Sequence, residues 1–330
     1  MIKRLLVYLV VSVVSFIGVL WFVGVKDVMD SLLSMDPVWL IPIGILVIPP
    51  YIIRGFRWRL LLNAVVVDPP EPRQLIIWVI LGDFINYVLP VGGAGAVFKS
   101  ALYSKVKAER FSLILSTVTV ERAFDGFIVA SLGFIGALML GRYDPVISFV
   151  LGLVFGLSVL AFVLIALFRS RKELFMRIAG YFARFFPQKA AGRGLEIVSG
   201  LLDGTKAVRF DRSTLKIMLL SFGVWVCGIL ANISLFKSAS MPINLGVIIV
   251  GSTIFALSIL IPSPPVRAGS FEVMWTFTFG LVGVPLDKAL AMSIAIHLVI
   301  LLVFMPLGVA SLFHLGLGFK DLPLKKNERS

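Results

Sequence analysis

The sequence has few charged residues and almost no cysteine or histidine. Only 15% of its 330 residues are charged, against about 25% in a typical soluble domain, and 59% are hydrophobic. The single cysteine, Cys227, excludes an intramolecular disulfide, and two histidines leave no His/Cys cluster for a metal site. With a mean hydropathy of +1.01, the chain is predicted to be an integral membrane protein with no metal and no cofactor.

The basic residues are unevenly placed along the chain. The formal net charge is +13, but Lys and Arg gather in the short segments between apolar runs, as topology signals and anionic-lipid contacts do. The segments assigned to one side of the membrane hold 25 of them, and those on the other side hold four. The first set is 3–4, 54–73, 99–110, 169–216 and 320–329. The positive-inside rule then predicts a multi-pass protein of the cell membrane with both termini in the cytoplasm and no nucleic-acid partner.

Most of the chain falls into apolar runs. The runs long enough to span a bilayer are 5–25, 37–53, 112–140, 145–168, 215–236 and 289–313. The first is interpreted as a retained helix, because no small-residue cleavage site follows it. Two further apolar stretches, 75–98 and 245–284, are interrupted in their middles. Each is predicted to form a re-entrant helical hairpin.

Both interruptions combine proline with glycine. The turn residues are Pro90, Gly92, Gly93 and Gly95 in the first hairpin and Pro262, Pro265 and Gly269 in the second. Non-helical backbone at membrane depth must be buried in protein or line a cavity. Paired breaks in the two halves therefore predict a substrate site between two repeats.

The order of the segments is the same in both halves: span, span, hairpin, span. Because the halves begin on opposite sides of the membrane, the chain is predicted to be an all-α polytopic membrane protein with two inverted-topology repeats, each of three spanning helices plus one re-entrant hairpin. Residues 1–330 form a single membrane domain, with 1–140 as the first repeat and 141–168 with 215–313 as the second.

The segment 169–214 is interpreted as a basic cytoplasmic linker between the repeats. Apolar residues recur in it at helical spacing from Leu174 to Phe185, with arginines elsewhere around the turn. This pattern predicts an amphipathic helix on the inner leaflet. The alternative is a cytosolic helix that packs on neighbouring loops.

Several ionisable residues lie inside the predicted spans. Glu121, Arg122 and Asp125 are about a third of the way along one span, where each charge costs on the order of 2.5 to 3.5 kcal/mol. Arg122 is spaced to pair with Asp125, so the three form either the wall of a substrate cavity or a structural ion cluster. His297 lies at a comparable depth in the last span. It is either a proton relay or a histidine that is satisfied by a backbone carbonyl.

The first hairpin carries Asp83 and Asn86 before its turn and Lys99 after it. Backbone amides near Gly95, together with Lys99, are predicted to hold an anionic group such as a lipid phosphate. The alternative is that the glycines only permit a tight turn.

In the second hairpin, Arg267 supplies the matching positive charge. Glu272 either caps the returning helix or faces the cavity. Arg54 and Arg57, with the neighbouring Trp58, are placed at the end of a span, where arginine side chains reach lipid headgroups at the interface.

Enzyme signatures are missing from the sequence. It contains no HExxH, no GxxxxGK[ST] and no GxSxG pattern. The chain is therefore predicted not to be an enzyme.

Four motifs together resemble the lysylphosphatidylglycerol synthase transmembrane family, whose members are also described as flippase-like. In chain order they are R-x-x-R-W-x-x-L-L at Arg54, Arg57, Trp58, Leu61 and Leu62, N-x-x-L-P at Asn86, Leu89 and Pro90, E-R-x-x-D at Glu121, Arg122 and Asp125, and the Pro265, Gly269 and Glu272 element. The chain departs from the family pattern at four positions. The family often has Glu where this chain has Ala96, Arg where it has Lys99, and two glycines where it has Val266 and Arg267. These departures imply a changed headgroup preference.

The resemblance implies transbilayer translocation of an anionic phospholipid or lipid-linked headgroup, held in a midplane cavity between the two hairpins. Its partners would be membrane lipids that are anionic or carry phosphate, with the lipid and the oligomeric state left open. One rival is a membrane-embedded transferase that uses Glu121 or Asp83 as a base. A second rival is a scaffold for a separate lipid synthase or glycosyltransferase.

Overall fold

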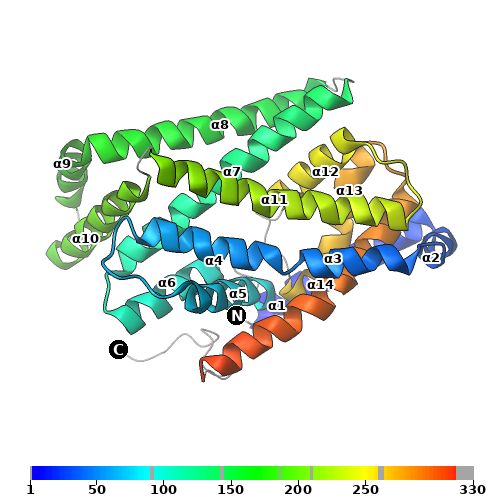
Figure 1. The fold of residues 1–330 in the computed structure, drawn as a ribbon, viewed down its shortest axis with the longest axis horizontal. Helices are drawn as coiled ribbons and strands as arrows, with labels where there is room; N and C mark the ends of the chain where they lie inside the picture. Colours follow the sequence, from blue (N-terminus) through cyan, green and yellow to red (C-terminus); the bar gives the residue numbers. More distant parts are fainter. Residues whose placement is uncertain are drawn as a thin grey trace.

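The computed structural model describes residues 2–89, 93–141, 145–185, 187–208, 211–258 and 264–316. Over these ranges the chain forms α-helices and a few short 3-10 turns (Figure 1). The predicted all-α class is confirmed. The turn residues Pro90, Gly92 and Pro262 lie outside the described ranges.

Five helical runs are long and apolar enough to cross a membrane by length and composition. The first run, Pro37–Leu62, comprises the 3-10 turn η1 (Pro37–Trp39), α3 (Leu40–Leu46) and α4 (Pro49–Leu62). The other four are α7 (Phe111–Leu140), the Phe149–Ser170 part of α8 (Pro145–Ser170), α11 (Arg212–Ser238) and α14 (Leu286–His314). These agree with five of the predicted spans. The first predicted span corresponds to α1 (Ile2–Val23), of which Val13–Val23 is a shorter apolar helix. Gly24, at φ +104°, separates α1 from α2 (Val25–Leu33).

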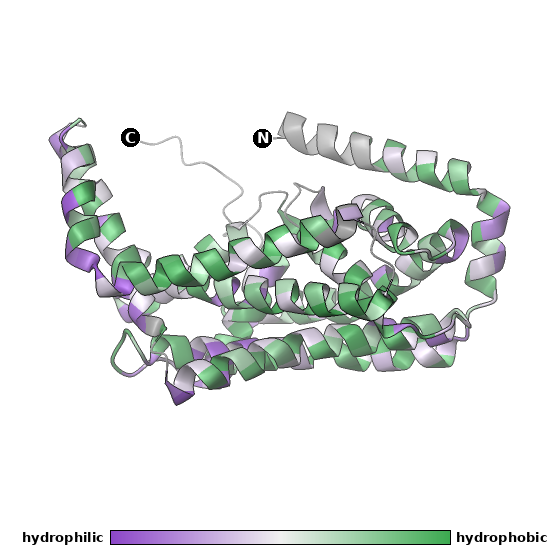
Figure 2. Cartoon of the chain, turned by 90° about the horizontal axis from the view of Figure 1, so that it is seen from above, coloured by the Kyte–Doolittle hydropathy of each residue, from purple (hydrophilic) through white to green (hydrophobic). Residues whose placement is uncertain are grey.

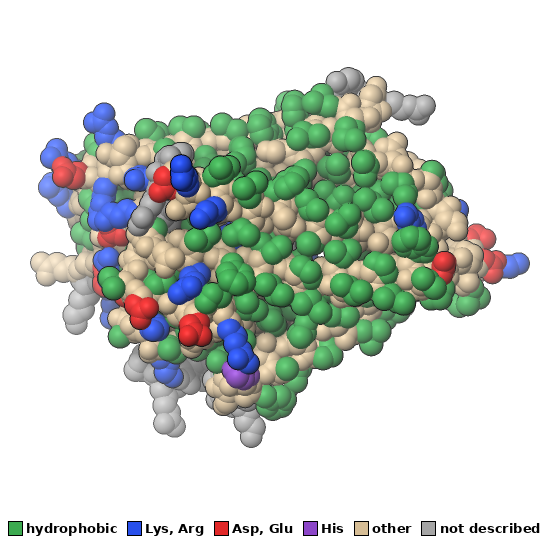
Figure 3. All heavy atoms as spheres, in the orientation of Figure 1, with side chains coloured by type: hydrophobic (Ala, Val, Ile, Leu, Met, Phe, Trp, Pro, Cys, Tyr) green, Lys and Arg blue, Asp and Glu red, His purple; other side chains and the backbone are tan. Residues whose placement is uncertain are grey.

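Charge is concentrated at the two ends of the long axis. On the face shown in Figure 3, Lys and Arg side chains gather over the end that carries α9 (Lys172–Ala183) and α10 (Gln188–Gly204), and a smaller charged group lies at the α2 end. On that face hydrophobic side chains cover most of the surface between these ends, and the ribbon in Figure 2 is coloured mostly hydrophobic over the same helices. An apolar band with charged ends is the surface expected of a chain that spans a bilayer.

Two pairs of shorter helices occupy the predicted hairpins. The first pair is α5 (Pro72–Val88) and α6 (Ala94–Lys107), and the second is α12 (Leu245–Ser258) and α13 (Ser270–Leu281), preceded by the 3-10 turn η3 (Pro265–Arg267). Helices α5 and α6 pack on each other, as do α12 and α13. In Figure 1 the first pair lies toward the α9–α10 end and the second toward the α2 end.

Glycine allows α5 and α6 to approach closely. A Cβ atom on Gly95 would lie 1.8 Å from the carbonyl oxygen of Gly82, so any side chain here would force the helices apart. Gly93, just before α6, has φ +80°. Both positions therefore require glycine for the turn and for packing.

The core is formed by contacts between the two halves of the chain. Helix α7, which follows the first pair, packs on α12 of the second, while α14, which follows the second pair, packs on α5 of the first. Helices α4 and α11 pack on each other. Buried side chains fill these contacts, among them Phe84 and Phe304 of α5 and α14 and Ala137 and Val250 of α7 and α12.

The linker contains two helices, α9 and α10. The apolar residues of α9 and the turn after it are exposed, with Tyr181 and Phe182 each 59% and Phe185 73% accessible. Helix α10 instead packs on the start of α7, where Gly200 and Gly204 lie against Ser112 and Ser116. The predicted helix is thus present as α9, and a second helix that the periodicity did not predict anchors the linker to the membrane domain.

Asp203 of α10 is the polar anchor of the linker. Its carboxylate accepts hydrogen bonds from Lys172 (2.6 Å) and Arg110 (3.2 Å) and pairs with Lys206 (2.9 Å). Burial raises the pKa of Asp203, but the hydrogen bonds from Lys172 and Lys206 outweigh burial and lower this pKa to about 2. The linker is therefore held by a charged cluster as well as by glycine packing.

Candidate functional site

Arg57 is the centre of a buried ion cluster between α4 and α7. Its side chain is fully buried, and its Nη2 donates to Glu121 Oε1 at 2.7 Å while Nη1 lies 2.5 Å from Asp125 Oδ1. Glu121 and Asp125 are four residues apart on α7, so they share a face and one guanidinium can reach both. Nη1 also donates to Ser221 Oγ of α11 at 2.7 Å.

Lys99 of α6 completes this cluster from the side of the first hairpin. Its Nζ donates to Glu121 Oε2 at 2.9 Å and lies 4.7 Å from the ring centroid of Trp58. Trp58 is fully buried and donates through Nε1 to Thr117 Oγ1 at 3.1 Å. Both carboxylate oxygens of Glu121 are therefore occupied by cations, an arrangement that suits an ion-pair partner better than a general base.

A second, more accessible cluster surrounds Asp83 of α5. Arg54 donates to Asp83 Oδ2 at 2.7 Å, and Arg122 approaches Oδ1 at 3.8 Å. Asp83 also interacts electrostatically with Lys99 and with Arg267 of η3. It is therefore the carboxylate that the cations of both hairpins share.

A Glu–His pair links the start of α13 to α14. Glu272 Oε1 of α13 and His297 Nδ1 of α14 lie 2.6 Å apart, and His297 Nε2 faces the carbonyl oxygen of Val266 at 3.1 Å. The imidazole stacks on Phe271 with a centroid distance of 4.3 Å. Both Glu272 and His297 are buried.

The two hairpins meet at Tyr87. Its ring, near the end of α5, lies 5.4 Å from the guanidinium carbon of Arg267 and 6.3 Å from the ring of His297. Helix α5 also packs directly on η3. The polar residues of the two breaks thus form one continuous group, although they are far apart in the sequence.

The predicted anion site at the start of α6 is occupied by the protein itself. Asn86 Oδ1 accepts a hydrogen bond from the Gly95 amide at 2.7 Å, and Lys99 is bound to Glu121. Asn86 therefore links the end of α5 to the start of α6, where Gly95 allows the two helices to approach closely. At the other break, Pro265 begins η3 and Gly269, at φ +77°, precedes α13.

Three other expectations about side-chain position are corrected. Asp125 pairs with Arg57, so Arg122 has Asp83 as its partner and not Asp125. Arg57 and Trp58 are fully buried inside the protein and do not reach lipid headgroups, because Arg57 pairs with the carboxylates of α7 and Trp58 donates to Thr117. Glu272 forms its hydrogen bond with His297 and does not cap α13 through a hydrogen bond.

Sequence reasoning missed Ser221, Tyr87 and Val266. Ser221 lies in an apolar run with no motif around it, and Tyr87 occupies a variable position of the N-x-x-L-P motif. Val266 contributes a backbone oxygen that no side-chain pattern indicates. For Arg57, the R-x-x-R-W motif marked the position but not the direction of its side chain.

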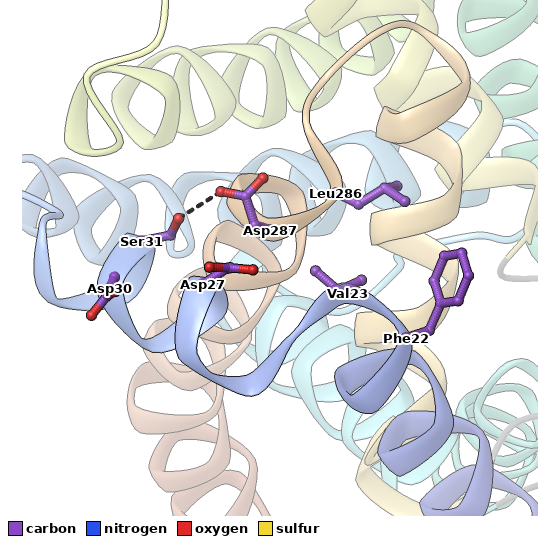
Figure 4. Close-up of a pocket in the computed structure, with 7 residues that line it drawn as sticks. All are labelled: Phe22, Val23, Asp27, Asp30, Ser31, Leu286 and Asp287. Atoms are coloured by element: carbon purple, nitrogen blue, oxygen red, sulfur yellow. Dashed lines mark hydrogen bonds between the residues drawn. The ribbon is translucent and has the colours of Figure 1, made fainter.

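A cavity of about 580 Å³ lies at the α2 end, away from these clusters. Figure 4 shows Asp27, Asp30 and Asp287 around it, with Ser31 Oγ donating to Asp287 Oδ2 at 2.8 Å. In the part of the chain that the structure describes, no group of three or more His, Cys, Asp or Glu residues is arranged to hold a metal ion. The ion clusters around Arg57 and Asp83, with convergent charges from α4, α5, α6 and α7, are the better functional candidate.

The fold and these clusters define a multi-pass, all-α membrane protein with buried polar clusters between its helices. The model of the lysylphosphatidylglycerol synthase TM region matches residues 5–308, and the chain belongs to this family. It is 23% identical over 303 residues to a UPF0104 membrane protein of Methanothermobacter thermautotrophicus, covering 87% of this chain and 86% of the relative. A UPF0104 membrane protein of Methanocaldococcus jannaschii is 21% identical over 303 residues, with 89% of each chain covered. No solved structure matches the chain significantly.

Proposed function

We propose that this protein moves an anionic lipid across the bilayer, with the phosphate-bearing headgroup held at the polar centre between the two hairpins. The proposal rests on the exposure and position of the Arg122 side chain. Its side chain is 49% exposed, yet it lies eleven residues into α7. At a rise of 1.5 Å per residue this is about 16 Å along a helix of 30 residues, about a third of its length and inside its apolar run.

An exposed guanidinium at that depth needs water or an anion. A charged side chain at the bilayer centre costs at least about 2.5 to 3.5 kcal/mol, and Asp83 is only a distant partner at 3.8 Å. A lipid phosphate that entered beside α7 would supply the missing anion while its acyl chains stayed in the bilayer. The headgroup alone would then need to be enclosed by protein.

The charge of the centre also favours an anion. Five basic residues face four carboxylates across the polar centre, namely Arg54, Arg57, Lys99, Arg122 and Arg267 against Asp83, Glu121, Asp125 and Glu272. Arg54 Nε is buried and has no hydrogen-bond partner among the described residues. It is a donor that an oxyanion can use.

The arrangement of helices supports inverted repeats with re-entrant hairpins. If α1, α4, α5–α6 and α7 correspond to α8, α11, α12–α13 and α14, then the α7–α12 contact has its counterpart in α14–α5, and α4–α11 is a contact between equivalent helices. The two hairpins lie toward opposite ends of the long axis (Figure 1). Such a pair of broken segments meeting near the middle is how transporters with inverted repeats build a substrate site.

The experiment is lipid recovery with the purified protein. Extracted in nanodiscs of native membrane, the protein should retain phosphate-bearing anionic lipids above their bulk fraction by mass spectrometry, and Arg122→Ala should lose that enrichment. Arg193→Ala, which removes an exposed cation on α10, is the matched control and should keep it. Equal lipid composition in all three samples and in bulk membrane would overturn the proposal.

A further inference from the structure

The hydrogen-bond partners of His297 determine how many protons the Glu272–His297 pair holds. A carbonyl oxygen can only accept, so the 3.1 Å contact with Val266 requires a hydrogen on His297 Nε2. The 2.6 Å contact between His297 Nδ1 and Glu272 Oε1 then requires a second hydrogen, on one of those two atoms. The buried pair therefore holds a shared proton and carries no net charge.

Loss of that proton must break a contact. Without it, the lone pair of Nδ1 would face a carboxylate oxygen at 2.6 Å, and moving the remaining ring hydrogen to Nδ1 would set Nε2 against the Val266 carbonyl. Either His297 leaves Glu272 or it releases Val266. The pair would then carry one negative charge in a buried place.

Arg267 and the Glu272–His297 pair both lie against Tyr87. Glu272 Oε2 is buried and has no hydrogen-bond partner among the described residues, and the Tyr87 ring lies 5.4 Å from the guanidinium carbon of Arg267 and 6.3 Å from the His297 ring. Arg267 is next to the residue whose carbonyl His297 holds, and Val266 and Arg267 both have left-handed backbone, with φ +55° and +54°. Release of Val266 would therefore free a strained turn and let Arg267 swing toward the new carboxylate.

Other ionisable groups around the pair are few. Tyr87 faces it from α5 and Arg267 from η3, and Asp83 acts on Arg267. Helices α12 and α3, which pack on α13 and α14, contain no ionisable residue. Helix α1, which packs on both, has its ionisable residues in its first two turns, and α11, which packs on α14, has Arg212, Lys216 and Lys237 toward its ends and Cys227 between them. The acidic residues of α2 lie with Asp287 at the start of α14, ten residues before His297.

We propose that the Glu272–His297 pair is the binding site for a coupling proton, and that proton and lipid phosphate bind together. With the proton in place, Arg267 is free to contact the phosphate. When the proton leaves to water, the Glu272 carboxylate competes for Arg267 and weakens the hold on the lipid. This linkage to a lipid rests on the proposed function, whereas the proton site itself does not.

The chain has only two histidines, which makes the proton site directly observable. In a His314→Gln protein, which loses only the exposed histidine at the end of α14, ¹⁵N-histidine spectra report His297 alone. We expect protonated Nε2 at all pH values below one transition between pH 5 and 9. In Glu272→Gln the transition should no longer occur at the wild-type pH, because the amide replaces the carboxylate that shares the proton.

Thiol labelling measures how the accessibility of the turn around Val266 and Arg267 changes with pH. In a Cys227→Ala background, a cysteine at Ala268 should react with maleimide at least about fivefold faster above the transition than below it, a preference of about 1 kcal/mol between the two states. Rates are taken relative to a cysteine at exposed Ser170, which corrects for the pH dependence of thiol reactivity. Glu272→Gln should abolish the change at that pH.

The outcomes separate the two proposals. A His297 transition with a responsive turn, but no movement of fluorescent phosphatidylglycerol in vesicles, would support the proton site and contradict lipid transport. Lipid movement that is unaltered by Glu272→Gln, with no His297 transition between pH 5 and 9, would overturn the proton site and leave transport standing. If Glu272→Gln fails to fold, the pH dependence of the His314→Gln spectra and of labelling at Ala268 decides alone.

Discussion

Arg57 and Arg122 are arginines in neighbouring spans whose surroundings are opposite. Arg57 is fully buried, with both α7 carboxylates and Ser221 as partners, whereas Arg122 is half exposed with one distant partner. Breaking a buried pair leaves an uncompensated charge, while an exposed pair contributes little. The first arginine is therefore assigned to stability and the second to binding.

Arg57→Met tests the structural assignment. The substitution leaves Glu121 and Asp125 without their shared cation, and we expect a loss of about 3 to 5 kcal/mol in stability. The expected result is a clearly lower melting temperature in detergent, or aggregation during purification. Full stability would show that the cluster is not what holds α4 to α7.

Arg122→Ala tests the functional assignment. Because its pairing is long and exposed, we expect a change of less than about 1 kcal/mol in stability. Lipid movement should fall about tenfold or more, as loss of a charge-assisted contact of about 1.5 to 3 kcal/mol predicts. A monodisperse protein that melts like wild type but moves no lipid is the expected result, and unfolding would return Arg122 to a structural role.

At the scale of elements, composition predicted the spans and the place of the breaks. Hydropathy alone locates long apolar helices, because each must match the bilayer thickness. It did not predict α10, whose first turns are rich in glycine and polar residues and whose packing surface is a set of glycines against Ser112 and Ser116. Small-residue contacts of this kind carry no hydrophobic signal.

Gly204→Leu tests how tightly α10 is held on α7. A Cβ there would lie 1.3 Å from Ser116 Oγ, so the helices must separate, and overpacking of this kind costs about 1 to 3 kcal/mol or more. We expect faster proteolysis of the linker. Gly192→Leu on the same helix, where a Cβ meets nothing within 4 Å, is the matched control and should resist protease as wild type does.

At the scale of the whole molecule, the sequence predicted which residues matter but not how they pair. Motif positions such as Glu121 and Glu272 lie in the polar centre, yet the partners Arg57 and His297 come from helices whose relative rotation a single sequence does not encode. Pairing of Asp125 with Arg57 rather than Arg122 depends on how α4 packs on α7. The orientation in the membrane is likewise predicted from the distribution of Lys and Arg along the chain and not from the fold.

The charge bias predicts the orientation of the protein. In a Cys227→Ala background, a cysteine at Ala190 on α10 should react with impermeant maleimide only from the cytoplasmic side, and one at exposed Ser240, between α11 and α12, only from outside. Intact cells and inverted vesicles give the two measurements. Labelling of Ala190 in intact cells would contradict the orientation and the inverted repeat.

The central claim is that both hairpins hold one anionic headgroup as it crosses the bilayer. It is tested most directly by the flip rate of fluorescent phosphatidylglycerol in phosphatidylcholine vesicles that contain the purified protein. Wild type should exceed protein-free vesicles, and Arg122→Ala and Arg267→Ala should each slow the probe about tenfold or more. Because the two arginines share Asp83 as a neighbour and the phosphate as a ligand, the double variant should lose less than the product of the single losses. Flip rates equal to protein-free vesicles with folded wild-type protein, or losses that simply multiply, would contradict a shared site.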